Sequence, residues 1–215
     1  MAANKLKRDI RLQIDIKNYK IFTLKAFFII INRDMRKIVN KNVNIKSGAL
    51  LYEIKSFYQT FILLKEKNDK RMQMMASERF NIKEYEELDL YFPSYVINSC
   101  FLAELELKFL LSITGVEFSS GSKGHLLNYL FNIISTTNKV EMKTHYNNLI
   151  SLYYSKSNYP EYLIKQFIDQ SSYNYRDFRY MWERGSLHYN STFMDMFVTA
   201  NYEYIVKTFN HLFPL

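Results

Sequence analysis

A chain of 215 residues is long enough for one sizeable hydrophobic core with an extension, and is short for two independent domains. Hydrophobic residues make up 48% and aromatic residues 17%, which excludes the disordered class, while only 5 Gly and 3 Pro argue against a turn-rich β sandwich or barrel. The net charge of +8 favours polyanionic partners such as RNA, DNA or an anionic membrane face.

The first residues of the chain are charged, so the sequence predicts no secretory signal. The longest apolar stretch, 24–31, contains Lys25 and is far shorter than the roughly 20 residues that span a bilayer. Its β-branched part fits a short strand or a buried helical turn, and helix is favoured. We therefore expect a cytoplasmic protein without a membrane span.

Apolar residues recur at helical spacing from 49 to 64, after Ser47, which can cap a helix. This pattern predicts a helix of several turns. The charge cluster 65–71 that follows is typical of a solvated helix end or a loop, with a polyanion contact as the alternative. Residues 1–84 are thus expected to form a helical N-terminal extension.

A very apolar helix is predicted to begin near Pro93, because proline fits the first turn of a helix. It should end near Thr114, before Gly115. Glu104 and Lys108 interrupt its apolar sequence, so these polar groups require partners.

The stretch 121–124 is a connector, since its two glycines lack the spacing of a phosphate-binding loop. Further helices are expected after it, in the ranges 125–134, 139–154, 161–169, 176–184 and 192–213. Residues 85–215 are therefore predicted to form one all-α, bundle-like domain.

Chemistry-bearing residues are densest in the segment 177–188. If it is helical, Arg179 and Glu183 share one face, and Arg184 and His188 share the adjacent one. Such a segment is a candidate phosphate-handling surface.

Three motifs occur in order: Ala-Glu-Leu-Glu-Leu-Lys at 103–108, Gly-His-Leu-Leu at 124–127 and Arg-Tyr-Met-Trp-Glu at 179–183. Over roughly residues 93–213, the chain resembles the HEPN superfamily of α-helical domains. The resemblance implies a bundle of four to five helices, usually a homodimer and often encoded in toxin-antitoxin or antiphage defence systems. Many members of that superfamily are metal-independent endoribonucleases.

The active-site signature of the superfamily is an arginine and a histidine with about four to six residues between them. Both residues lie at the dimer interface. There the guanidinium binds the scissile phosphate, and the imidazole acts as general acid or base. Here Arg184 and His188 have three residues between them, and Arg179 and His188 have eight, so neither pair fits that signature. Arg184, His188 and Arg179 are the catalytic candidates, and surface roles for Arg184 and His188 remain open.

The other charged motif residues, Glu104, Lys108 and Glu183, are expected to form a structural charge network, either as simple intrahelical pairs or as a buried network across helices. His125 and Tyr180 are candidate binding residues. Because His125 follows a glycine at a helix start, a capping or packing role is the alternative. His145 lies among polar residues and is expected to be exposed.

One Cys and four scattered His offer no zinc site, and no dinucleotide fingerprint occurs, so neither metal nor cofactor is expected. The first hypothesis is a HEPN-type endoribonuclease that acts as a toxin or antiphage effector and binds RNA at a dimer interface. The second is a catalytically inactive HEPN-like module that binds or senses a protein partner, such as an antitoxin, or a nucleic acid. Peripheral membrane attachment through the basic N-terminal region is a third.

Overall fold

The computed structural model describes residues 47–77, 81–173 and 189–212. In chain order, the elements are α2 (Ser47–Met75), α3 (Ile82–Asp89), α4 (Phe92–Ile113), the 3₁₀ helix η1 (Ser122–His125), α5 (Leu127–Thr136), α6 (Val140–Ser157), α7 (Glu161–Ser171), α10 (Ser191–Phe209) and the 3₁₀ helix η2 (Asn210–Leu212). No strand occurs in the described ranges, which confirms the all-α class.

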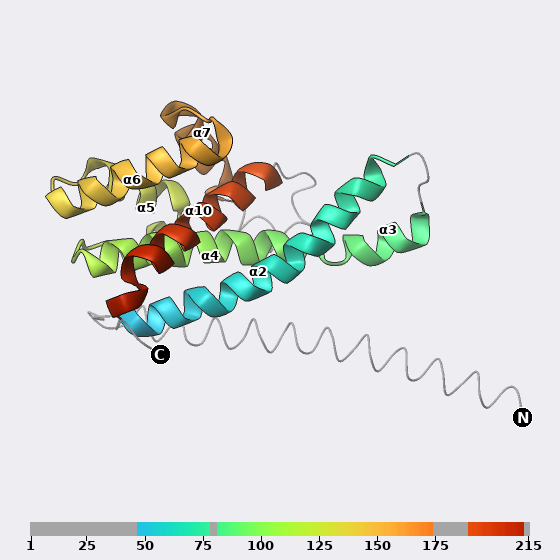
Figure 1. Ribbon diagram of the computed structural model, residues 1–215, viewed down its shortest axis with the longest axis horizontal. Coiled ribbons are helices and arrows are strands. Elements are labelled where there is room, and N and C mark those ends of the chain that lie inside the picture. The colour runs from blue at the N-terminus through green and yellow to red at the C-terminus, as the bar shows by residue number, and fades with distance from the viewer. Residues whose placement is uncertain (1–46, 78–80, 174–188, 213–215) are drawn as a thin grey trace, which may run out of the picture. The chain divides into compact units, whose positions relative to one another are not determined.

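Helix α4 is the centre of the fold, because α2, α3, α5, α6 and α10 all pack against it (Figure 1). Its sequence is apolar on nearly every face, as expected for a helix that is buried all round. Pro93 lies in its first turn, where a missing N–H costs nothing. Gly115 follows its last turn with a φ of 60°, a left-handed conformation that glycine adopts without strain. The predicted ends of this helix are confirmed.

Helix α2 is longer than the pattern of apolar residues predicts, since the charge cluster expected to end it is itself helical. Lys65 forms an ion pair with Asp69 at 2.7 Å and a second with Asp195 of α10 at 3.0 Å. Arg71 reaches Asp89 of α3 at 2.6 Å. Long charged side chains favour helix, and these ones also tie α2 to its neighbours. The loop alternative was therefore wrong, whereas exposed residues such as Lys67 and Lys70 in the last part of α2 fit the alternative of a solvated helix end.

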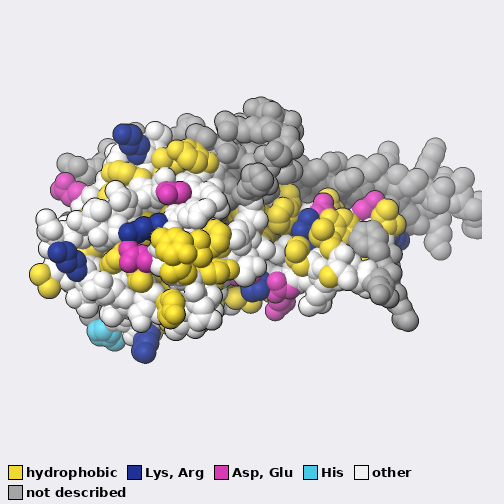
Figure 2. Space-filling view, turned by 90° about the horizontal axis from the view of Figure 1, so that it is seen from above, with side chains coloured by type: hydrophobic (Ala, Val, Ile, Leu, Met, Phe, Trp, Pro, Cys, Tyr) yellow, Lys and Arg dark blue, Asp and Glu magenta, His cyan; other side chains and the backbone are white. Residues whose placement is uncertain are grey.

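Helix α3 precedes Pro93, where the sequence pattern predicts no helix. The Asn81 side chain caps it by accepting a hydrogen bond from the Glu84 N–H. With the C-terminal part of α2 it forms a hairpin that extends beyond the other helices (Figure 1). In Figure 2, hydrophobic side chains on this hairpin lie at the surface beside charged ones. The large exposed ones include Met72, Met75, Ile82, Leu90 and Tyr91.

All described residues belong to one compact unit, Asn44–Leu215. The boundary predicted at residue 84 lies inside this unit, within α3, and α2 packs against both α4 and α10. The part of the predicted N-terminal extension that is described is helical, whereas residues 1–46 lie outside the described residues.

The later helices follow the sequence prediction closely. Those expected at 125–134, 139–154, 161–169 and 192–213 are present as α5, α6, α7 and α10 with η2, with small shifts at their ends. The connector contains the single turn of η1. The helix expected at 176–184 lies outside the described residues. Within the ranges that are described, no helix is long and apolar enough to cross a membrane.

Candidate functional site

The candidate site begins with a carboxylate inside the central helix. Glu104 of α4 is 1% exposed and is flanked along the helix by apolar residues. A charge in such a place requires a partner, because the protein interior solvates it poorly. Lys108, one turn later, supplies one, with its Nζ 2.6 Å from Glu104 Oε1. The Lys108 side chain is 13% exposed, so the ammonium lies at the edge of the core.

A second partner of this carboxylate comes from η1. Nδ1 of His125 lies 2.9 Å from the same oxygen, Glu104 Oε1. The carboxylate orients the ring and, when the imidazole is neutral, favours the tautomer with its proton on Nδ1. The side chain is 30% exposed, and its Nε2 makes no hydrogen bond to the described residues. Nε2 is therefore left as an acceptor on a partly exposed ring.

Gly124 determines where this imidazole lies. A Cβ at this position would lie 1.9 Å from the carbonyl oxygen of Ser119, so only glycine permits the observed backbone path. The same loop is held to α5, because the Ser119 N–H donates to the Tyr129 hydroxyl at 3.1 Å. Glycine at position 124 is thus a geometric requirement for the backbone path that places His125 against Glu104.

We call Glu104, Lys108 and His125 the acid–base cluster. An imidazole held by a buried carboxylate can accept or give a proton at its other nitrogen. The ammonium of Lys108, which also lies 5.8 Å from the centre of the Phe118 ring, adds a positive charge beside it. The cluster therefore combines a proton-transfer group with a cation, the two elements that phosphate ester chemistry requires.

The structure brings together some of the residues singled out in the sequence. The intrahelical contact expected between Glu104 and Lys108 is present. His125 binds Glu104 and does not cap α5, whose N-cap residue is Leu126. The remaining candidates lie outside the described residues: Arg179, Tyr180, Glu183, Arg184 and His188.

Replacing Lys108 by Met should lower the free energy of unfolding by about 3 kcal/mol, because the nearly buried Glu104 loses its closest cation. Urea denaturation at neutral pH measures this change. Lys143 is an exposed lysine of α6 and provides the matched control, since Lys143→Met should leave the midpoint unchanged. Equal urea midpoints for Lys108→Met and Lys143→Met would show that the ion pair of Lys108 with Glu104 does not stabilise the fold.

Sequence reasoning missed Glu106, which is 0% exposed in α4. Neither of its carboxyl oxygens has a hydrogen-bond partner among the described residues. Burial raises the pKa of Glu106 well above its ordinary value, and the neighbouring Asn201 side chain offsets only part of that rise. The two glutamates of Glu-Leu-Glu point to different faces of the helix, so Glu106 is separate from the acid–base cluster. A second glutamate in an apolar helix was the signal that could have revealed it.

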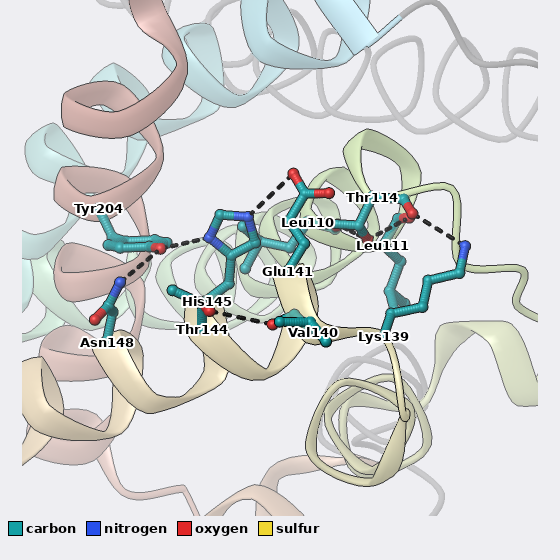
Figure 3. Close-up of polar contacts among 10 residues, drawn as sticks. All are labelled: Leu110, Leu111, Thr114, Lys139, Val140, Glu141, Thr144, His145, Asn148 and Tyr204. Atoms are coloured by element: carbon teal, nitrogen blue, oxygen red, sulfur yellow. Dashed lines mark hydrogen bonds and ion pairs between the residues drawn. The ribbon is translucent and has the colours of Figure 1, made fainter.

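The expectation of an exposed His145 was wrong, because packing of α6 on α10 leaves its side chain 10% exposed. Its Nδ1 lies 2.6 Å from the Tyr204 hydroxyl, and its Nε2 faces Glu141 at 3.8 Å (Figure 3). Burial lowers the pKa of His145, and the charge of Glu141 opposes that change. This neutral imidazole connects two helices and is structural.

In the described part of the chain, no group of three or more His, Cys, Asp or Glu side chains could hold a metal ion. No protein-family model, curated protein or solved structure matches the chain. The relationship to the HEPN superfamily therefore stays a prediction from the motifs, two of which supply the three residues of the acid–base cluster.

Proposed function

We propose that the chain is a metal-independent endoribonuclease of the HEPN type, acting as a toxin or antiphage effector on RNA bound at a dimer interface. The observation that carries the proposal is the contact of a partly exposed His125 with the buried Glu104, beside Lys108. The net charge of +8 also favours a polyanionic substrate.

In this proposal His125 acts as the general base. Its Nε2 takes the proton of the ribose 2′-hydroxyl, whose oxygen attacks the adjacent phosphorus as the bond to the 5′-oxygen breaks. Glu104 stabilises the imidazolium that forms. Arg179 and Arg184 keep the phosphate-binding role that the resemblance implies, and His188 gives a proton to the leaving 5′-oxygen. The products are a 2′,3′-cyclic phosphate and a free 5′-hydroxyl.

The proposal predicts that the purified protein cleaves single-stranded RNA in the presence of EDTA. His125→Asn should lower the cleavage rate by about 10²-fold or more, which is the usual contribution of a general base. His211 is an exposed histidine on η2, and His211→Asn is the matched control that should keep the wild-type rate.

Thermal unfolding of both variants separates a loss of chemistry from a loss of fold. The pH profile of the cleavage rate adds a second readout, because removal of a base should abolish the acidic limb of the profile. An inactive wild-type protein, or a His125→Asn variant that cleaves at the wild-type rate, would reject the assignment.

A second candidate function is a non-catalytic HEPN-like module that binds a protein or nucleic-acid partner. The observation that favours it is that Lys108 and His125 both bind the same oxygen of Glu104, as expected if the cluster only neutralises a buried charge. Under this alternative, RNA binds or a partner co-purifies, but no product forms with EDTA or with added metal. The cleavage assay therefore distinguishes the two functions.

A further inference from the structure

An aromatic side chain borders the acid–base cluster and takes no part in the cleavage steps above. Phe118 lies in the loop between α4 and η1, and its side chain is partly exposed. The ammonium of Lys108 lies 5.8 Å from the centre of its ring, within the range of a cation–π contact. Lys108 thus lies between the Phe118 ring and Glu104, the carboxylate that also holds His125.

The Phe118 ring does not belong to the hydrophobic core. It is not among the buried hydrophobic side chains, and it contacts no other aromatic ring in the described part of the chain. In contrast, Phe109 and Phe193 of the core each pack against another aromatic ring. A partly exposed ring presents apolar surface to water, and a nucleobase covers such a surface when it stacks.

The backbone of the loop holds Phe118 in place from both sides. Before it, the Val116 N–H donates to the Leu111 carbonyl at 2.8 Å and closes the last turn of α4. After it, the Ser119 N–H donates to the hydroxyl of Tyr129 in α5 at 3.1 Å. A ring on a fixed backbone loses little conformational entropy when a ligand binds, so the ring is prepared for stacking.

Positive charge lies around the same loop. Three lysines contribute it: Lys108 in the cluster, the exposed Lys123 in η1, and Lys139 at the start of α6. Nζ of Lys139 donates to the Thr114 carbonyl at 3.1 Å, which places this cation where the loop begins. Glu117 is the acidic residue of the loop sequence, so the cations outnumber the acids there. A basic surface with an aromatic ring is what proteins use to hold single-stranded nucleic acid.

We propose that Phe118 is a base-stacking residue that makes the acid–base cluster specific for single-stranded RNA. A base stacked on the ring brings the adjoining phosphate toward Lys108 and the imidazole of His125. The bases of a duplex are already stacked on one another, so they reach the ring only after unstacking. This inference deepens the proposed function and rests on it for the choice of RNA as the ligand.

The test measures RNA binding in the absence of chemistry. The ligand is a short single-stranded RNA whose 2′-hydroxyls are methylated, so that no 2′-oxygen can attack the phosphate. Phe118→Leu removes the aromatic face and keeps an apolar side chain, whereas Phe118→Tyr keeps the ring. Tyr162→Leu, at an exposed tyrosine of α7, is the matched control. Fluorescence anisotropy at low salt measures the affinity of each variant.

We expect Phe118→Leu to bind this RNA about tenfold more weakly than the wild type, as for the loss of one stacked base. Phe118→Tyr and Tyr162→Leu should bind within about twofold of the wild type. An abasic strand of the same length and charge should bind equally to the wild type and Phe118→Leu, because it has no base to stack. A purely structural role of Phe118 would instead weaken the binding of both strands.

A second measurement uses the wild-type protein alone and carries the test if thermal unfolding shows that Phe118→Leu does not fold. The RNA is substituted with 5-iodouridine, which light cross-links to an aromatic ring on which the base stacks. Mass spectrometry should locate the cross-link at Phe118. No RNA binding by the wild type, equal RNA binding by the wild type and Phe118→Leu, or no cross-link at Phe118 overturns the proposal.

Base stacking and the proposed function can fail separately. If RNA binding depends on Phe118 but RNA with free 2′-hydroxyls is not cleaved, base stacking stands and the catalytic assignment is rejected. If cleavage depends on His125 while Phe118→Leu binds RNA as the wild type does, the catalytic assignment stands and base stacking is rejected.

Discussion

Glu106→Gln is expected to raise the free energy of unfolding at neutral pH, and to raise it more as the pH increases. The carboxyl group is 0% exposed, and neither oxygen has a hydrogen-bond partner among the described residues. Burial raises its pKa well above the ordinary value. Ionisation in this place is costly, and glutamine has nearly the same shape without that cost.

The pH dependence follows from proton linkage. In the unfolded chain Glu106 loses its proton near pH 4.3, whereas in the folded protein it keeps the proton to a higher pH. The folded state therefore binds more protons between these two pKa values. Its contribution to stability is fully present below about pH 4.3 and falls by about 1.4 kcal/mol for each further pH unit, until the folded-state pKa is reached.

Urea denaturation at several pH values between 4 and 8 measures this slope. Wild-type protein and Glu106→Gln should have similar stability at the acidic end and diverge toward pH 8. Glu87 is an exposed glutamate of α3, and Glu87→Gln is the control that should run parallel to the wild type. A difference between Glu106→Gln and wild type that stays constant with pH would show that Glu106 ionises normally in the folded protein.

Local sequence signals predicted most of the helices correctly. Pro93 and Gly115 mark the two ends of α4, because the properties that make them useful there depend only on the backbone. The length of α2, in contrast, could not be predicted from local signals. Its charged C-terminal part is helical and forms ion pairs with α10 and α3, such as Lys65 with Asp195. These partners are far away in sequence. No local pattern contains that information.

Of the two contacts in the acid–base cluster, one could be predicted from the sequence and the other could not. The contact of Glu104 with Lys108 follows from their spacing on one helix, so it could be predicted. The contact of His125 with Glu104 depends on how the chain returns from the end of α4 through η1, which the sequence does not specify. For Arg179, Arg184 and His188, the catalytic roles remain predictions.

Gly124→Ala is expected to lower the free energy of unfolding by about 3 kcal/mol, at the upper end of the cost of overpacking. The new Cβ would lie 1.9 Å from the Ser119 carbonyl oxygen and 3.1 Å from its carbon, both of them backbone atoms. Since no flexible side chain can move aside, η1 itself must shift. That shift should separate His125 from Glu104 and lower RNA cleavage as well.

Gly121, in the same loop, provides a control variant that should not lower the free energy of unfolding. A Cβ there would meet only the Ser119 hydroxyl, at an ordinary 3.6 Å, and the backbone has φ −85°, which alanine adopts readily. Gly121→Ala should therefore be neutral or stabilise the protein by about 0.4–1 kcal/mol, through the reduced entropy of the unfolded chain.

Thermal unfolding measures the stability of both variants, and nitrogen NMR shifts of the His125 ring report its contact with Glu104. If Gly124→Ala unfolds like Gly121→Ala and keeps the wild-type ring shifts, the close approach of residues 119 and 124 does not position the imidazole.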